Sequence, residues 1–271
     1  MRYAGLDFLY KPCDLKIFEY GDVYICTTFK IGTRSFSDTT NLINGYDLMR
    51  DDIHTLFRMF DKNKKIYIVI KNPVNRFISG ATQTTFEGAT QYTAAYSLAK
   101  WGSESHFFRE VWPQFVKGGI DNSTQVYSQN FDSSEFENIE SSISVWKTWL
   151  DIVHFNIRMG DAHLSQYHKH CYQNFYKVLK NHHDIEIIED TELMNHTIFK
   201  NITNTNLPPR THTNSKWNGF LKQNIIYDVD DTLPRVSINP FLITENAVEI
   251  EDYITEEFRY YNKLKNLIKH G

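Results

Sequence analysis

The sequence predicts an α/β fold in which a central, mainly parallel sheet is flanked by helices. Residues 22–26 and 66–70 are two runs of strand length, both rich in β-branched and aromatic residues, and the second is apolar throughout. A strand that is apolar on both faces suits the centre of a parallel sheet with helices on either side. Apolar residues at helical spacing lie between the two runs, which favours a right-handed strand–helix–strand unit.

Size and composition fit one domain with a sizeable core. Hydrophobic residues make up 41% of the 271 positions, which suffices for a single domain over 1–271, with residues 81–142 as a helical and loop insertion on the substrate side. The 16 Tyr and 19 Phe favour a thick core over a carbohydrate-facing cleft. A net charge of −4 excludes a surface that binds nucleic acid as a whole, so any anion site must be local.

The sequence shows no signal for secretion or for a membrane span. No long apolar segment follows the first basic residue, and no run approaches the roughly 18 apolar residues of a membrane helix. The three cysteines, Cys13, Cys26 and Cys171, do not form a disulfide framework. We therefore expect a soluble, cytoplasmic protein without a transmembrane segment.

The N-terminal part is expected to hold three strands and two helices. Ser37, Asp38 and Thr39 supply N-cap oxygens for the first helix. The expected elements are, in order, a strand at 15–20, a strand at 22–26, a helix that begins within 36–43, a helix at 46–60 and a strand at 66–70.

The rest of the chain is expected to be mostly helical. Ala94, Tyr96, Leu98 and Trp101 are candidate core residues of a partly helical stretch at 81–112. The other expected elements are a polar loop at 118–140, an amphipathic helix at 143–155, a strand at 185–188, and a helix with one broad apolar stripe at 248–268.

The turn after the strand at 22–26 has the composition of a phosphate-binding loop. It holds one lysine, one glycine and three side chains that donate hydrogen bonds, within the stretch from Lys30 to Ser35. Helix N-terminal N–H groups point at a bound anion, Gly32 lets the backbone approach closely, and Lys30 adds a point charge. The lysine precedes the glycine, so this turn is not a Walker A loop, in which the lysine follows the second glycine.

A second basic motif follows the strand at 66–70. Lys71 stands at the end of the strand, and Pro73 suits the first turn of a helix because it lacks an N–H group. Arg76 and Ser79 are three residues apart and therefore share a helix face. Open α/β sheets bind ligands outside the carboxyl ends of their strands, so the two motifs form one paired anion site if their strands are neighbours.

Together the two motifs resemble those of sulfotransferases that use 3′-phosphoadenosine-5′-phosphosulfate (PAPS). The first resembles the 5′-phosphosulfate loop Pro-Lys-x-Gly-[Ser/Thr]-[Ser/Thr], with Phe29 in place of the proline and Arg34 as an unusual residue. The second resembles the 3′-phosphate motif Arg-[Asp/Asn]-Pro-x-x-Arg-x-x-Ser, with Lys71 in place of the first arginine. The resemblance implies a P-loop-like three-layer sandwich that binds PAPS, releases 3′-phosphoadenosine 5′-phosphate (PAP) and needs no metal.

The segment 160–171 resembles part of the Golgi-type carbohydrate sulfotransferases. In those enzymes His-Trp-x-Pro-Gln leads to a cysteine; His163, Gln166 and Cys171 match, while Leu164 and Ser165 replace the tryptophan and the proline. This resemblance implies an acceptor hydroxyl on a carbohydrate.

The resemblance also implies roles for the motif residues, because sulfuryl transfer depends on positioning and on neutralisation of charge. Lys30 would bond the bridging oxygen and stabilise the leaving group. His163 would be the general base for the acceptor hydroxyl, with His106 and Glu87 as the next candidates. The cofactor contacts would be Lys30, Gly32, Thr33, Arg34 and Ser35 for the 5′-phosphosulfate, and Lys71, Arg76 and Ser79 for the 3′-phosphate.

Several alternatives remain open. A nucleotide kinase or related NTPase is the first alternative, but the sequence has neither a Walker A loop nor a Walker B aspartate after residues 66–70. A catalytically inactive sulfotransferase-like domain could bind a glycan, and His163 could be a structural histidine bonded to backbone. The cluster His163, His168, His170 and Cys171 does not have a recognised zinc spacing, so no metal is expected.

Overall fold

The computed structural model describes two sheets, the helices that pack around them and some of the connecting segments. The described residues are 15–28, 31, 41–43, 60–82, 84, 91–106, 109–110, 139–193, 196, 225–228, 235–238 and 244–268. They form an α/β structure, as the sequence predicts. No helix within these ranges is both long and apolar enough to cross a membrane.

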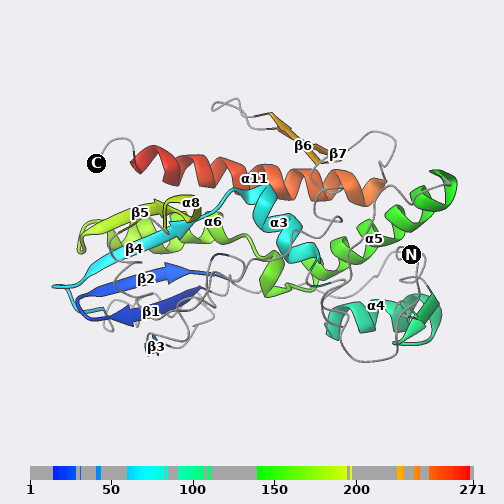
Figure 1. Cartoon of the computed structure of the whole chain (residues 1–271), viewed down its shortest axis with the longest axis horizontal. Coiled ribbons are helices and arrows are strands. Elements are labelled where there is room, and N and C mark those ends of the chain that lie inside the picture. Colours follow the sequence, from blue (N-terminus) through cyan, green and yellow to red (C-terminus); the bar gives the residue numbers. More distant parts are fainter. Residues whose placement is uncertain are drawn as a thin grey trace.

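The main sheet has five strands in the order β3-β1-β2-β4-β5 (Figure 1). β2 pairs with β4 and β4 with β5 in parallel, whereas β1 is antiparallel to both β2 and β3. Four strands therefore run in one direction and only β1 opposes them, which confirms a mainly parallel sheet. The strands are β1 (Lys16–Tyr20), β2 (Val23–Thr27), β3 (Asn41–Ile43), β4 (Lys65–Ile70) and β5 (Ile185–Glu189).

A two-residue turn makes β1 antiparallel to β2. Tyr20 pairs with Val23, so only Gly21 and Asp22 form the connection. Gly21 has a φ of 52°, a left-handed conformation that glycine adopts without steric penalty and that tight hairpin turns require.

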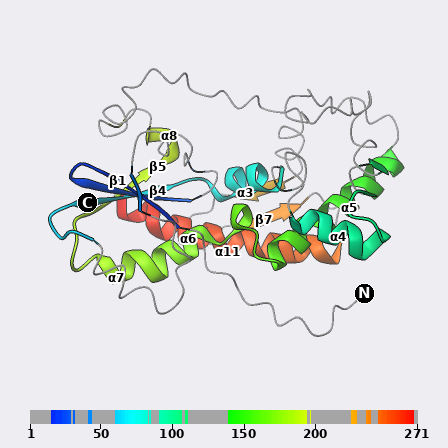
Figure 2. The same cartoon turned by 90° about the horizontal axis from the view of Figure 1, so that it is seen from below.

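The predicted central strand is confirmed. β4 has a partner on each edge, and Ile66, Ile68 and Ile70 on one face are fully buried, as is Val69 on the other face. Helices cover both faces of the sheet: α6, α7 and α11 lie on one side and α8 on the other (Figure 2). These layers are compatible with the three-layer sandwich that the sequence predicts.

The helices at and around the sheet match most of the predicted ones. α3 begins at Pro73, and α5 buries Trp149, Leu150 and Val153 as its pattern predicts. The helices are α3 (Pro73–Thr82), α4 (Gln91–Trp101), α5 (Ile139–Arg158), the 3₁₀ turn η5 (Ala162–Leu164), α6 (Tyr167–His170), the π-helical segment η6 (Cys171–Tyr176), α7 (Lys177–Leu179), α8 (Asp190–Leu193) and α11 (Glu245–Ile268).

A small antiparallel sheet lies over α11 in Figure 1. It consists of β6 (Ile225–Asp228) and β7 (Arg235–Ile238). The backbone N–H of Ile238 donates to Glu251 Oε1 of α11 at 2.6 Å, so a side chain of the helix holds one edge of this hairpin. The sequence did not predict these two strands.

Two local predictions were wrong. The helix predicted to begin within 36–43 is absent at Asn41–Ile43, which form β3 and pair with β1, because partners along β1 outweigh the local capping signal. Leu98 was expected in the core but is 47% exposed, because α4 packs on α5 through Tyr96, whose ring contacts Phe155. The expected helix at 46–60 lies outside the described residues except for Phe60. The expected loop at 118–140 also lies outside them except for Ile139 and Glu140, which begin α5 instead.

Candidate functional site

The parallel strands bring the starts of both predicted phosphate motifs to one edge of the sheet. β2 and β4 are neighbours, with Cys26 opposite Ile68, so Thr28 and Lys71 follow adjacent strand ends. β5 is parallel to β4 on its other side and places Asp190 at the same edge. This arrangement meets the condition under which the two motifs form one site.

The first residues of the predicted phosphate loop turn back toward the sheet. Thr27 Oγ1 donates to the carbonyl of Ile31 at 2.5 Å, and the N–H of Ile31 donates to the carbonyl of Thr28 at 3.2 Å. Ile31 itself is buried in the core. The residues to which the sequence assigns phosphate contacts here, Lys30, Gly32, Thr33, Arg34 and Ser35, lie outside the described residues, as does the candidate base Glu87.

Lys71 is held at the carboxyl end of β4 by both its backbone and its side chain. Its N–H donates to His168 Nε2 at 3.4 Å, and its Nζ lies 3.4 Å from Asp190 Oδ2. Burial raises the pKa of the Asp190 carboxyl, and the nearby Lys71 ammonium partly opposes that rise. A phosphate bound by Lys71 would therefore compete with one partly buried carboxylate.

Arg76 has a structural role that the sequence did not predict. It is only 4% exposed, its Nη1 donates to the Ser165 carbonyl at 2.6 Å, and its Nη2 donates to Ser165 Oγ at 3.0 Å. Its guanidinium also lies over the Tyr167 ring, 5.8 Å from the centroid. Arg76 thus joins α3 to the segment 165–167, whereas Ser79 on the same helix is only partly buried.

A buried carboxylate organises the segment that follows. Glu257 of α11 accepts a hydrogen bond from the backbone N–H of His168 at 3.0 Å and a second one from the Nδ1 of His168 at 2.8 Å. A third comes from the backbone N–H of Lys169 at 3.1 Å. Burial alone would raise the pKa of Glu257, but the hydrogen bonds from His168 and the nearby Arg76 guanidinium hold it below its ordinary value. With Nδ1 bonded to Glu257 and Nε2 accepting from Lys71, His168 connects α11 to the end of β4.

Tyr167 connects the same segment to two strands at once. Its hydroxyl lies 2.9 Å from the Val69 carbonyl of β4 and 3.3 Å from the Cys26 carbonyl of β2. α6 therefore braces the carboxyl edge of the sheet through two consecutive side chains, Tyr167 and His168. Sequence analysis missed this brace, although a glutamate within the apolar stripe of α11, next to Phe258, was a signal for it.

His163 lies in η5, against the far end of α3. Asp161 Oδ1 accepts both the backbone N–H and the Nδ1 of His163 at 2.9 Å, and the Asp161 side chain is buried. This pairing fixes the ring and makes Nε2 the basic nitrogen when Nδ1 carries the proton. Gly80 packs against the His163 carbonyl so closely that a Cβ there would collide with it.

The second and third predicted motifs are therefore in contact, through Arg76 with Ser165 and Gly80 with His163. His106, the second candidate base, lies beside α4 and is tilted against Trp101, with ring centroids 4.9 Å apart. Within the ranges that the structure describes, no three His, Cys, Asp or Glu side chains are grouped so that they could hold a metal ion.

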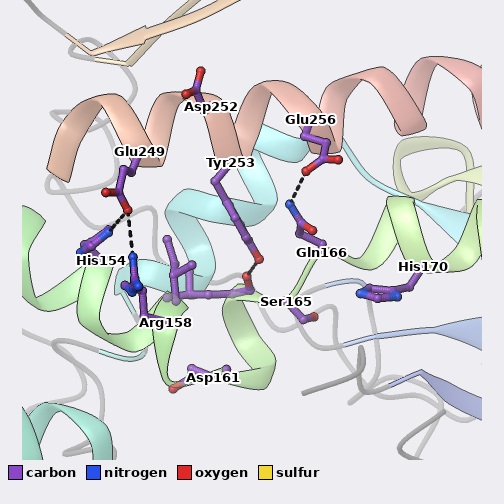
Figure 3. Close-up of a pocket in the computed structure, with 13 residues that line it drawn as sticks. His154, Arg158, Asp161, Ser165, Gln166, His170, Glu249, Asp252, Tyr253 and Glu256 are labelled. Atoms are coloured by element: carbon purple, nitrogen blue, oxygen red, sulfur yellow. Dashed lines mark hydrogen bonds and ion pairs between the residues drawn. The ribbon is translucent and has the colours of Figure 1, made fainter. Parts of the chain in front are cut away.

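A pocket of about 410 Å³ opens on the other side of η5, between the end of α5 and the middle of α11 (Figure 3). Its polar lining includes Asp161, Ser165 and Gln166 from the segment around η5. Asp161 is thus shared between the pocket and the pairing with His163.

Comparison of the chain with protein-family models, with curated proteins and with solved structures gives no match. The function must therefore be inferred from the residues and their arrangement.

Proposed function

We propose that the chain transfers a sulfuryl group from PAPS to an acceptor hydroxyl on a carbohydrate. The observation that carries the proposal is the parallel pairing of β2 with β4, because it sets the two basic motifs side by side at the carboxyl edge of the sheet. The proposal includes a P-loop-like arrangement in which the loop after β2 surrounds the 5′-phosphosulfate. No metal is required.

The motif residues then have distinct tasks. Lys30 bonds the bridging oxygen as it gains negative charge, and the loop from Gly32 to Ser35 binds the equatorial oxygens. Lys71 binds the 3′-phosphate as a point charge and exchanges its Asp190 partner for the ligand. Arg76 contributes its charge from the buried side and keeps the segment 165–167 in place.

His163 is the proposed base. The Asp161 carboxylate holds its ring and stabilises the imidazolium that forms when Nε2 takes the proton of the acceptor hydroxyl. The oxygen then attacks sulfur, the S–O bond to the nucleotide breaks, and the electron pair leaves on the 5′-phosphate of PAP.

A nucleotide-triphosphate enzyme is the main alternative, because β5 ends at Glu189 and α8 begins at Asp190, where such an enzyme could hold Mg²⁺. Both carboxylates have cationic partners: Glu189 Oε1 lies 2.7 Å from Lys265 Nζ, and Asp190 pairs with Lys71. This pairing favours the PAPS proposal. A domain that binds a glycan without catalysis is the other alternative.

Nucleotide choice tests the proposal. By calorimetry, PAP should bind at least about tenfold more tightly than ATP or adenosine 5′-phosphate, which corresponds to about 1.4 kcal/mol. Equal affinity for PAP and adenosine 5′-phosphate would contradict the 3′-phosphate role of Lys71 and Ser79.

A matched pair of lysine variants tests catalysis. Lys30→Ala should lower turnover about 100-fold or more, as loss of a transition-state donor does, with a smaller change in PAP affinity. Lys62→Ala removes an exposed lysine just before the N-terminal end of β4, away from the proposed site, and should change neither turnover nor PAP affinity. Unchanged turnover in Lys30→Ala would refute the assignment of the loop.

A further inference from the structure

Lys71 and Asp190 form an ion pair at the carboxyl edge of the sheet, beside the strand end to which the 3′-phosphate is assigned. Lys71 Nζ lies 3.4 Å from Asp190 Oδ2, and the two side chains are 24% and 26% exposed. Helix α8, which begins at Asp190, packs against both β4 and β5 (Figure 1). The pair is therefore placed by the fold and is still within reach of a ligand from solvent.

The two carboxylates at the end of β5 are held in different ways. Glu189 Oε1 lies 2.7 Å from Lys265 Nζ and accepts a hydrogen bond from the Tyr261 hydroxyl at 2.8 Å. Asp190 has Lys71 as its only cationic partner within the described part of the chain. A ligand that takes Lys71 would thus leave Asp190 without a cation, whereas Glu189 would keep both of its partners.

The surroundings of Asp190 already oppose its negative charge. Burial raises the pKa of the Asp190 carboxyl and the Glu189 carboxylate adds to the rise, while Lys71 and the backbone N–H of Thr191 act against it. An anion bound to Lys71 would take away the main opposing charge and bring a second like charge close to Asp190. The protonated form of Asp190 would then be favoured, with the proton taken from solvent.

We propose that Asp190 is a specificity-determining residue that competes with the nucleotide for Lys71. In the free protein it holds the Lys71 ammonium, it takes up a proton when a phosphate replaces it there, and it recaptures Lys71 as the product leaves. The proposal rests on the proposed function, because the phosphate at Lys71 is taken to be the 3′-phosphate of PAP. A carboxylate so close to this phosphate weakens binding and speeds release, and product release limits the turnover of many enzymes.

Asp190→Asn tests the competition, because it keeps the size of the side chain and removes its charge. By calorimetry at about pH 8, this variant should bind PAP about threefold or more tightly than the wild type does. Its affinity for adenosine 5′-phosphate, which lacks the 3′-phosphate, should change less than about twofold. Dissociation of PAP, followed by stopped-flow, should slow by a similar factor, because changes in affinity appear mostly in the dissociation rate.

Asp184→Asn is the matched control. The Asp184 carboxylate also faces a lysine, with Oδ2 at 3.7 Å from Lys65 Nζ, but it precedes the opposite end of β5. It should change neither the affinity for PAP nor the rate of PAP dissociation. Asp190→Ser removes the same charge with a smaller side chain and gives the same test if Asp190→Asn does not fold.

The dependence on pH separates loss of charge from a structural effect of the substitution. The ratio of PAP affinities between Asp190→Asn and the wild type should shrink as pH falls from about 8 to about 5.5, because a protonated Asp190 is as neutral as asparagine. Titration of the PAP phosphates cancels in this ratio, since both proteins bind the same ligand. A structural effect of the substitution would leave the ratio unchanged over this range.

The inference is overturned if Asp190→Asn binds PAP no more tightly than the wild type, or if its advantage is the same at both pH values. Loss of magnesium-dependent ATP binding in Asp190→Asn would also overturn it, because Asp190 would then be a metal ligand. Failure of the proposed function has a different signature: the wild type itself would bind PAP and adenosine 5′-phosphate equally.

Discussion

At the scale of single residues, Glu257 is a buried carboxylate on which three hydrogen bonds depend. It accepts three hydrogen bonds from His168 and Lys169, and it lies on the core face of α11 beside Phe258. A carboxylate in this position is stable only because every bond is made, since an unpaired buried charge is strongly unfavourable. Its loss would leave two backbone N–H groups and one ring nitrogen without an acceptor.

Glu257→Ala should therefore lower the free energy of unfolding by about 3–5 kcal/mol, and Glu257→Gln should lower it by less because the amide oxygen still accepts. Urea unfolding followed by circular dichroism measures both. Asp252→Asn changes an exposed carboxylate on the same helix and serves as the control, with an expected effect within about 0.5 kcal/mol. An alanine variant as stable as this control would show that the network contributes little.

His163 can be tested by its effect on the rate. His163→Ala should lower sulfuryl transfer by about 10² to 10⁴-fold and abolish the rise of activity with pH that deprotonation of a base produces, while PAP affinity stays within about twofold. His182→Ala, an exposed histidine, is the control. If His163→Ala loses PAP binding instead, this residue belongs to the cofactor wall, and the base should be sought at His106 or Glu87.

At the scale of elements, the packing of α3 on η5 sets where His163 lies. Gly80 is the point of closest approach, and the buried Arg76 reaches Ser165 one helical turn earlier on the same helix. Helix and turn are thus joined at two points, one through backbone contact and one through a side chain. Displacement of either element would move the proposed base relative to the sheet edge.

Gly80→Ala tests this joint. A Cβ at this position overlaps the His163 carbonyl oxygen, and because that atom is backbone, the two elements must separate, at a cost of about 1–3 kcal/mol in stability. Asn75→Ala on the same helix is the control, since it also raises helix propensity without a close contact. Thermal unfolding of the two variants gives the comparison, and equal melting temperatures would mean that α3 is not held closely against η5.

At the scale of the whole molecule, stability should depend on pH through His183. This histidine is 8% exposed in the turn before β5, and neither ring nitrogen has a partner within the described part of the chain. Phe60 packs edge-on against it, and the nearby charged groups are Lys62, His182 and Asp61. Burial lowers the pKa of His183, with His182 and Lys62 acting in the same direction and Asp61 against it.

The sign of the effect follows from this lowered pKa. The unfolded chain binds a proton at His183 more readily than the folded chain, so stability is complete above about pH 6.5 and falls as pH drops below it. His183→Leu should flatten this acid limb between about pH 6.5 and 5, without loss of stability at pH 7, because it removes two unsatisfied polar atoms. Urea titrations at a series of pH values measure it. His182→Gln should flatten the limb only in part, because it removes one of the neighbouring charges that lower the pKa of His183. An unchanged limb in His183→Leu would place the cause elsewhere.

Those parts of the fold that have a strong local signal could be predicted from the sequence. The apolar run of β4, the proline that begins α3 and the stripe of α11 each lie within one element. β3 could not be predicted, because its assignment depends on a partner in β1. The same holds for the site: Lys71 at a strand end follows from local pattern, whereas the bond from Arg76 to Ser165 joins residues 89 positions apart.

The brace formed by Tyr167 has a consequence for the order in which the chain folds. The hydroxyl of Tyr167 contacts carbonyls 98 and 141 positions earlier, and His168 needs Glu257, 89 positions later. During synthesis, β2 and β4 leave the ribosome long before α6, and α6 leaves it long before α11. This sheet edge therefore lacks the Tyr167 contacts until α6 emerges, and His168 lacks its carboxylate partner until α11 emerges, so the edge is completed only late in synthesis.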